Sequence, residues 1–196
     1  MSATKIIPRW EWRCFAPSLA ALARKIDAPV GTNARESDET YILEHASGAS
    51  DNIKIRDGVL DLKRLRQTDS AGLEQWEPVL KASFPLRRSD MAAVFGDQVL
   101  QRDSYTLDEF TNFVAHLPGF RAVTVHKSRR GFTFGGCISE LARITVGTVA
   151  LESFSLEHED PKLVLASLRT LDLDGHANIS YPMGLKRALG LAHVPA

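Results

Sequence analysis

The stretch that most constrains the fold is residues 52–66, NIKIRDGVLDLKRLR, which predicts a β-hairpin. Asp57-Gly58 lies between two runs of strand-forming residues, and this pair strongly favours a two-residue hairpin turn. Because side chains alternate along a strand, each strand presents charged residues on one face. They are Lys54 and Arg56 on the first strand, and Asp61 and Lys63 on the second. The hairpin is therefore either a solvated sheet edge whose lysines oppose aggregation or part of an anion site inside a barrel.

Length, charge and cysteine content narrow the class of protein. The chain has 196 residues and a formal net charge of zero, so it offers no broad basic surface for nucleic acid. A net charge of zero still permits a concentrated site of one sign. Two cysteines, Cys14 and Cys137, are too few for a disulfide framework and fit a reducing compartment. The sequence shows no signal-peptide core and no apolar run that could cross a membrane, so we expect one cytoplasmic domain over residues 1–196.

Several other segments show the alternation that is typical of a strand. In residues 6–15, IIPRWEWRCF, the charged residues Arg9, Glu11 and Arg13 share one face, and the tryptophans share the other. Further strands are predicted over residues 39–44, 73–86 with an interruption at Pro78, 120–128, 132–146 and 148–159.

Glycine and polar residues predict where these strands end. Arg130-Gly131 predicts the turn between the segments 120–128 and 132–146, and Gly135-Gly136 predicts a bulge or bend. The polar residues 33–38 predict a loop.

Helices are predicted where a capping residue precedes an apolar stripe. T-L-D-E, from Thr106 to Glu109, is a capping box, and Asp160-Pro161 is an N-cap followed by proline at the first helical position. The predicted helices cover residues 18–27, 89–95 with Ser89 as the cap, 106–117, a segment from Asp160 onward, and 180–189.

This inventory favours an α+β fold built on a barrel. About eight short strands, several with a charged face, suit a closed eight-stranded antiparallel β-barrel with a polar interior and helices packed outside. A two-layer α+β sandwich is the alternative that the pattern leaves open.

The charged segments, in their order along the chain, resemble the CYTH superfamily, the triphosphate tunnel metalloenzymes. R-W-E-W-R lies where the family has Glu-x-Glu-x-Lys, and K-I-R-D-G-V-L-D-L-K resembles its Arg-x-Arg hairpin followed by a strand ending in lysine. Lys127-x-Arg129 resembles the family's basic strand, and Glu157-His158-Glu159 its closing Glu-x-Glu. The resemblance covers nearly the whole chain and implies an eight-stranded barrel that forms a tunnel for a triphosphate.

The resemblance also implies a role for each residue that matches a motif. Arginine binds phosphate oxygens in a bidentate manner and lysine as a point charge, whereas Mg²⁺ or Mn²⁺ binds to carboxylate oxygens together with substrate phosphates. The implied phosphate-binding residues are Arg9, Arg13, Lys54, Arg56, Lys63, Lys127 and Arg129. The implied metal ligands are Glu11, Glu157 and Glu159, and the implied catalytic residues are Glu11, Arg13 and Lys63.

The main departure from the family pattern lies in the first strand, where Arg9 stands at the place of the family's first glutamate. This exchange replaces a metal ligand by a cation, which keeps two functions open. The first is metal-dependent hydrolysis of inorganic triphosphate, thiamine triphosphate or a nucleoside triphosphate. The second is binding of a phosphorylated ligand without turnover. Adenylate cyclase activity is a lesser alternative, since the family includes cyclases.

Overall fold

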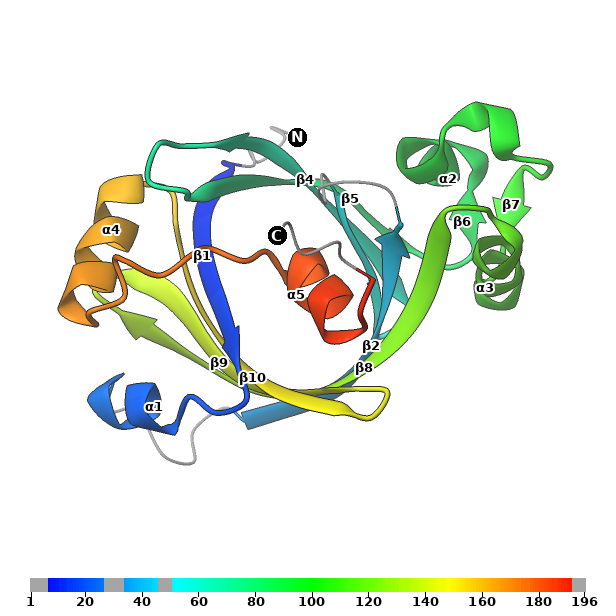
Figure 1. The fold of residues 1–196 in the computed structure, drawn as a ribbon. Coiled ribbons are helices and arrows are strands. Elements are labelled where there is room, and N and C mark those ends of the chain that lie inside the picture. The colour runs from blue at the N-terminus through cyan, green and yellow to red at the C-terminus, as the bar shows by residue number, and fades with distance from the viewer. Residues whose placement is uncertain (1–6, 27–33, 46–50, 192–196) are drawn as a thin grey trace.

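Eight strands close into an antiparallel barrel in the computed structural model, which describes residues 7–26, 34–45 and 51–191 (Figure 1). The strands are β1 (Arg9–Ala16), β2 (Ala34–Glu44), β3 (Asp51–Arg56), β4 (Val59–Thr68), β5 (Glu74–Ser83), β8 (Phe120–Phe134), β9 (Cys137–Val146) and β10 (Val149–His158). Around the barrel they follow the order β1-β10-β9-β8-β2-β3-β4-β5. The closed barrel confirms the predicted fold class and excludes the sandwich. The element ends predicted at residues 6, 27 and 33 lie outside the described residues.

The central hairpin forms from β3 and β4, as predicted. Asp57 and Gly58 have φ values of 52° and 70°, which a two-residue turn with two left-handed positions requires. The cross-strand pairs are Asn52 with Lys63 and Lys54 with Asp61. Directly paired residues point to the same face of a sheet, so these four side chains lie together inside the barrel. Since a closed barrel has no free edge here, the solvated-edge interpretation is wrong.

Strand β8 is longer than predicted, and the turn after it lies farther along the chain. The strand continues without a break to Phe134, so the turn predicted at Arg130-Gly131 is wrong. The chain turns instead at Gly135-Gly136, where φ is 56° and 83°. Two consecutive glycines adopt positive φ without the steric cost that a Cβ would bring. Arg130 is paired with Leu141 in the ladder between β8 and β9.

Two further predictions, of a loop and of a helix start, differ from the structure. Residues 34–38 belong to β2 and pair with β8, although their polarity predicts a loop. Here backbone pairing with a long neighbouring strand outweighs the side-chain preference.

The helix predicted from Ser89 begins at Arg88, with Arg87 at the cap position. The backbone N–H of Arg87 donates to the carboxylate of Asp90.

Four helices cover two sides of the barrel, where the apolar faces of the strands point outward (Figure 1). The helices α1 (Ala20–Ile26) and α4 (Pro161–Thr170) pack around Trp12 and Leu156. The chain segment that connects β5 to β8 forms a second group of elements, which packs over Leu60 and Leu62 of β4. It consists of β6 (Leu86–Arg87), α2 (Arg88–Phe95), the 3-10 helix η1 (Asp97–Val99), β7 (Ser104–Tyr105) and α3 (Leu107–His116). Among the described residues no helix has both the length and the apolar character needed to span a membrane.

Two predicted helix starts are confirmed by their capping contacts. The Thr106 side chain accepts a hydrogen bond from the backbone N–H of Glu109, whose carboxylate accepts one from the Thr106 N–H. The carboxylate of Asp160 accepts a hydrogen bond from the backbone N–H of Lys162 at the start of α4. Each cap pairs a backbone donor that the helix itself leaves without a partner.

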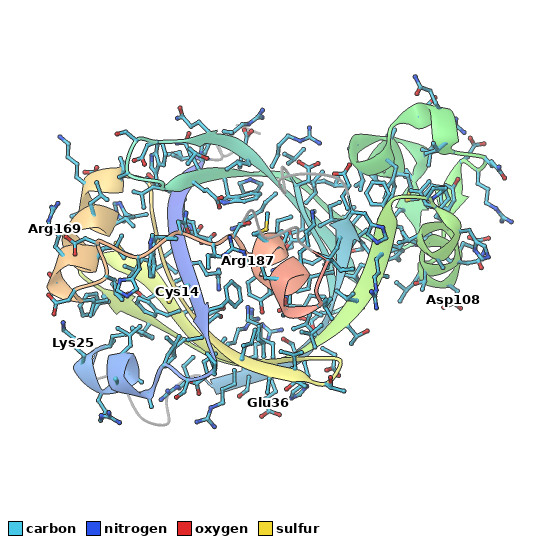
Figure 2. All side chains as sticks on the ribbon, in the orientation of Figure 1. Cys14, Lys25, Glu36, Asp108, Arg169 and Arg187 are labelled. Carbon is cyan, nitrogen blue, oxygen red and sulfur yellow. The ribbon has the colours of Figure 1, made fainter. Side chains whose placement is uncertain are left out.

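The last helix, α5 (Tyr181–Ala188), lies across one end of the barrel interior, a position that the sequence did not predict (Figure 1). Tyr181 and Leu185 join inward-facing strand residues in a buried cluster, and the Tyr181 ring stacks on the Tyr41 ring with centroids 4.9 Å apart. Gly184 faces Phe15 so closely that a Cβ at this position would lie 2.3 Å from the Phe15 ring. Side chains therefore fill the barrel at this end (Figure 2).

Candidate functional site: a charged cavity inside the barrel

The barrel interior encloses a polar cavity of about 170 Å³, bounded on one side by α5. Its lining carries five cations and four carboxylates, drawn from strands that are far apart in the sequence. The cations are Arg13, Lys54, Lys63, Lys127 and Arg129, the carboxylates are Glu11, Asp61, Glu140 and Glu157, and Tyr41, Asn52 and Tyr181 complete the lining. Two larger hollows, of about 380 and 470 Å³, lie on the outer surface beside α3 and α1. We take the interior cavity as the candidate site, because buried charges act there in a low dielectric.

Glu140 on β9 is the centre of the first group of charges in the cavity. Its carboxylate oxygens lie 2.8 Å from Lys127 Nζ, 3.6 Å from Arg13 Nη1 and 3.7 Å from Arg129 Nη1. Burial raises the pKa of Glu140, but the three cations, led by Lys127, outweigh burial and lower that pKa to about 2. Glu140 is therefore ionised at neutral pH and is a close anionic partner of all three cations.

Tyr181 of α5 forms an aromatic wall against which two cations rest. Arg13 Cζ lies 4.8 Å and Lys127 Nζ 4.6 Å from the centroid of its ring, which is within the range of a cation–π contact. Arg13 Nε also donates to a carboxylate oxygen of Glu11 at 2.9 Å. Burial raises the pKa of Glu11, but the charges of Arg13 and Lys63 outweigh burial and lower it below its ordinary value.

Behind the cavity wall lies a fully buried carboxylate, Glu39 on β2, whose exposed fraction is 0%. Its oxygens lie 3.8 Å from Lys54 Nζ, 3.5 Å from Arg56 Nη1 and 3.4 Å from Arg129 Nη1. The hydroxyl of Tyr41 donates to the same carboxylate at 2.9 Å. Burial lowers the pKa of Lys54 to about 8, although Glu39 opposes this shift.

Three glutamates form a row at the other side of the cavity. Glu74, Glu11 and Glu157 are paired in register on the adjacent strands β5, β1 and β10. Glu157 is neutralised by Arg9 Nη1 at 3.4 Å and by Lys63 Nζ at 3.8 Å. Burial, with a smaller contribution from the charge of Glu11, raises the pKa of Glu74 to about 7. The row is thus a place where added negative charge is unfavourable unless a cation accompanies it.

The structure brings most of the predicted site residues together. Those in the cavity lining are Glu11, Arg13, Lys54, Lys63, Lys127, Arg129 and Glu157. Arg9 and Arg56 do not line the cavity. Arg9 forms an ion pair with Glu157, and Arg56 forms one with Glu39. Glu159 lies apart from them, because it follows the last residue of β10 and is exposed. The catalytic and binding roles of these residues stay predictions.

Two further carboxylates and one aromatic side chain contribute to the site beyond the residues to which the resemblance gives a role. Glu140 and Glu39 lie on inward positions of β9 and β2, and the sequence marks them only as weaker candidates for metal ligands. Tyr181 reaches the cavity only because α5 folds back across the barrel end, and no local pattern predicts that return.

The carboxylates of the site fit a metal only in company with a ligand. Among the residues that the structure describes, no group of three His, Cys, Asp or Glu side chains is arranged to hold a metal ion. Glu11 and Glu157 are paired on neighbouring strands, but both are engaged by cations. Mg²⁺ that arrives with substrate phosphates needs only one or two protein carboxylates, which these two residues would supply. Such a metal would polarise phosphoryl oxygens.

Comparison with known proteins identifies related folds. No family model and no curated protein matches the chain, whereas solved structures do. HpAC1 from Hippeastrum, a candidate adenylyl cyclase with a dominant triphosphatase activity, aligns with a TM-score of 0.51 and 16% identity over 95% of this chain and 98% of its own. A conserved hypothetical protein from Pyrococcus furiosus aligns with a TM-score of 0.51 and 15% identity over 89% and 98%. A protein from Pyrococcus horikoshii OT3 aligns with a TM-score of 0.50 and 16% identity over 94% and 99%.

These likenesses concern the fold, because sequence identity is 15–16%. They extend over nearly the full length of each chain, so the whole barrel is shared and not a single motif. The barrel expected from the resemblance to the triphosphate tunnel metalloenzymes is thereby confirmed. The chain therefore shares its fold, which here is a closed eight-stranded antiparallel barrel, with these solved structures.

Proposed function

We propose that this protein binds a small triphosphate or polyphosphate in the charged cavity and hydrolyses it with the help of a divalent metal. The observation that supports this proposal best is the cavity lining, in which five cations from four strands face a space of about 170 Å³. A phosphate chain carries several negative charges in a row, and arginine and lysine in this density are the groups that bind such a chain.

The size of the cavity favours a small ligand. Sites for drug-sized ligands usually enclose about 300–1,000 Å³, which is more than the about 170 Å³ available here. Phosphate groups therefore fit inside, and the organic part of a larger ligand would have to remain outside the cavity.

Carboxylate partners hold the cations in place before a ligand arrives. Glu140 fixes Lys127, Arg13 and Arg129, each within 3.7 Å. Preorganised charges of this kind stabilise negative charge that develops in a reaction, because they need not reorient when it forms. Binding, orientation and charge stabilisation are thus supplied by the chain itself, and the metal adds polarisation of the phosphoryl oxygens.

Binding without turnover is the second candidate function, and a specific contact favours it. Arg9, at the place of the family's first glutamate, donates to Glu157 at 3.4 Å. Glu157 is thereby engaged by a cation and less available as a metal ligand. A barrel in this state keeps its phosphate-binding cations and lacks one oxygen ligand.

The first test is phosphate release from inorganic triphosphate, thiamine triphosphate and ATP, each with Mg²⁺, Mn²⁺ or EDTA. We expect release from at least one substrate with a metal and none with EDTA, because EDTA removes the divalent metal that the proposed reaction requires. Binding of triphosphate, seen as a raised melting temperature, without release under any condition would favour the second function. Absence of both binding and release would contradict the proposal.

Replacement of Lys63 by alanine tests the assignment of the cavity. We expect Lys63→Ala to weaken triphosphate binding about tenfold, which corresponds to about 1.4 kcal/mol. The variant removes one cation from the lining and also leaves Glu157 with a single partner. Isothermal titration in EDTA measures the affinity, and Lys162→Ala on the outer surface of α4 is the control. Equal affinities of Lys63→Ala and wild type would show that the ligand binds elsewhere.

A further inference from the structure

A buried carboxylate, Glu39, lies behind the wall of the proposed phosphate cavity. Glu39 is completely buried and is not part of the cavity lining, yet its charge acts across a short distance. By Coulomb's law alone, a fixed negative charge beside the cavity weakens the binding of a phosphate chain. Glu39 can therefore favour phosphate binding only if its effect on the neighbouring cations outweighs this repulsion.

The contacts of Glu39 point to such a role. One carboxylate lies within 3.8 Å of three cationic side chains, Lys54, Arg56 and Arg129, which come from two strands on either side of β2. Two of the three, Lys54 and Arg129, line the cavity. The hydroxyl of Tyr41 donates to the carboxylate at 2.9 Å and helps to fix it between them.

We propose that Glu39 is a positioning residue of the phosphate site: its carboxylate, 3.8 Å from Lys54 Nζ, keeps Lys54 in the protonated form that attracts phosphate. This inference rests on the proposed binding of a phosphate chain and specifies how the site is kept in its binding form. Removal of the Glu39 charge then weakens anion binding above neutral pH, which is opposite to the Coulomb expectation.

The surroundings of Lys54 explain why it needs this support. The groups that face it are Glu39 and Tyr41 on β2, Arg56 on β3, Asp61 and Lys63 on β4, and Lys127 and Arg129 on β8. Burial and the neighbouring cations lower the pKa of Lys54 to about 8, and Glu39 is the larger of the two acidic groups that oppose this shift. A neutral amine in the wall would no longer attract phosphate.

The sign of the pH effect follows from linkage. Phosphate binds better to protonated Lys54, so affinity decreases as the pH rises through the pKa of this amine in the free protein. Without the charge of Glu39, that pKa falls, and the decrease in affinity begins at a lower pH. Above both pKa values, a difference of one pKa unit corresponds to about a tenfold difference in affinity.

The experiment measures triphosphate affinity by isothermal titration in EDTA, between pH 6 and pH 9, for wild type, Glu39→Gln and Lys54→Arg. We expect Glu39→Gln to bind about tenfold more weakly near pH 9, with the difference vanishing below about pH 6. Lys54→Arg, whose charge does not titrate in this range, should lose the part of the pH dependence that belongs to Lys54. Titration of the triphosphate itself is common to all three proteins and cancels in the comparison.

Other outcomes would overturn the inference. Tighter binding by Glu39→Gln at every pH would mean that only its repulsion matters, and weaker binding by a constant factor would mean a purely structural role. If Glu39→Gln does not fold, the comparison of wild type with Lys54→Arg still decides, because an identical pH dependence of the two would exclude control by Lys54.

A second readout separates this inference from the proposed function. The ionisation of Lys54 can be followed by NMR in the free protein, with no ligand present. A lower Lys54 pKa in Glu39→Gln supports the inference even where triphosphate fails to bind, and such a failure would count against the proposed function alone. An unchanged Lys54 pKa would overturn the inference whatever the ligand does.

Discussion

Replacement of Arg13 by methionine is expected to destabilise the folded protein by about 3–5 kcal/mol, the range for breaking a buried ion pair from one side. Arg13 is only 8% exposed, and it lies 2.9 Å from Glu11 and 3.6 Å from Glu140. Methionine fills a similar length but leaves buried negative charge with fewer partners. The replacement of Arg13 also removes the contact between its guanidinium and the Tyr181 ring.

Urea denaturation monitored by circular dichroism measures this loss, and Arg143→Met is the matched control. The Arg143 side chain is 82% exposed and pairs with Glu152 on the outer surface, so we expect its replacement to cost about 0–1 kcal/mol. The deficit of Arg13→Met should shrink at acidic pH, because protonation of the freed carboxylates relieves their repulsion. Equal destabilisation by the two replacements would mean that the interior charges are solvated and not coupled.

Replacement of Gly184 by alanine is expected to displace α5 from the barrel end, with a loss of stability of about 1–3 kcal/mol. Alanine by itself favours a helix over glycine by up to about 1 kcal/mol. The added Cβ, however, would lie 2.3 Å from the ring of Phe15, a distance at which the helix or the ring must move. The ring has little freedom, since it also packs edge-on against Tyr181 with centroids 5.5 Å apart.

Gly175→Ala is the control for this prediction, because nothing lies within 4 Å of its added Cβ and its φ is not positive. Thermal or urea denaturation compares the two variants, and triphosphate titration reports whether Tyr181 has left the cavity wall. We expect Gly175→Ala to be close to wild type in both measurements. A Gly184→Ala protein with unchanged stability and affinity would show that α5 does not seal the cavity.

The hairpin of β3 and β4 shows how far local chemistry alone reaches. Asp57-Gly58 set the turn, and the two-residue period of a strand then placed Lys54 and Lys63 on one face. The same alternation in β1 separated Trp12, which packs beneath α1 and α4, from Glu11 and Arg13, which face the cavity. These assignments depend on neighbouring residues, so a single sequence contains what they require.

The errors in the prediction occurred where partner strands decide the outcome. Residues 34–38 look like a loop by composition, and they become a strand because β8 continues far enough to pair with them. Arg130-Gly131 resembles a turn, yet Gly135-Gly136 takes that role because both of its residues adopt positive φ. Propensity is a weak guide when long-range backbone pairing competes with it.

The sequence by itself therefore determined the strands that carry charge, the faces on which those charges lie and the two helix caps at Thr106 and Asp160. Only the tertiary structure decided that these faces turn toward one another around a closed barrel and that Tyr181 closes the cavity. The physical reason is that alternation and capping act over a few residues, whereas the pairing of Glu39 with Arg129, 90 residues away, exists only after the barrel has closed. The electrostatic character of the site, with an acid at a pKa of about 2 and a lysine at about 8, arises from that closure.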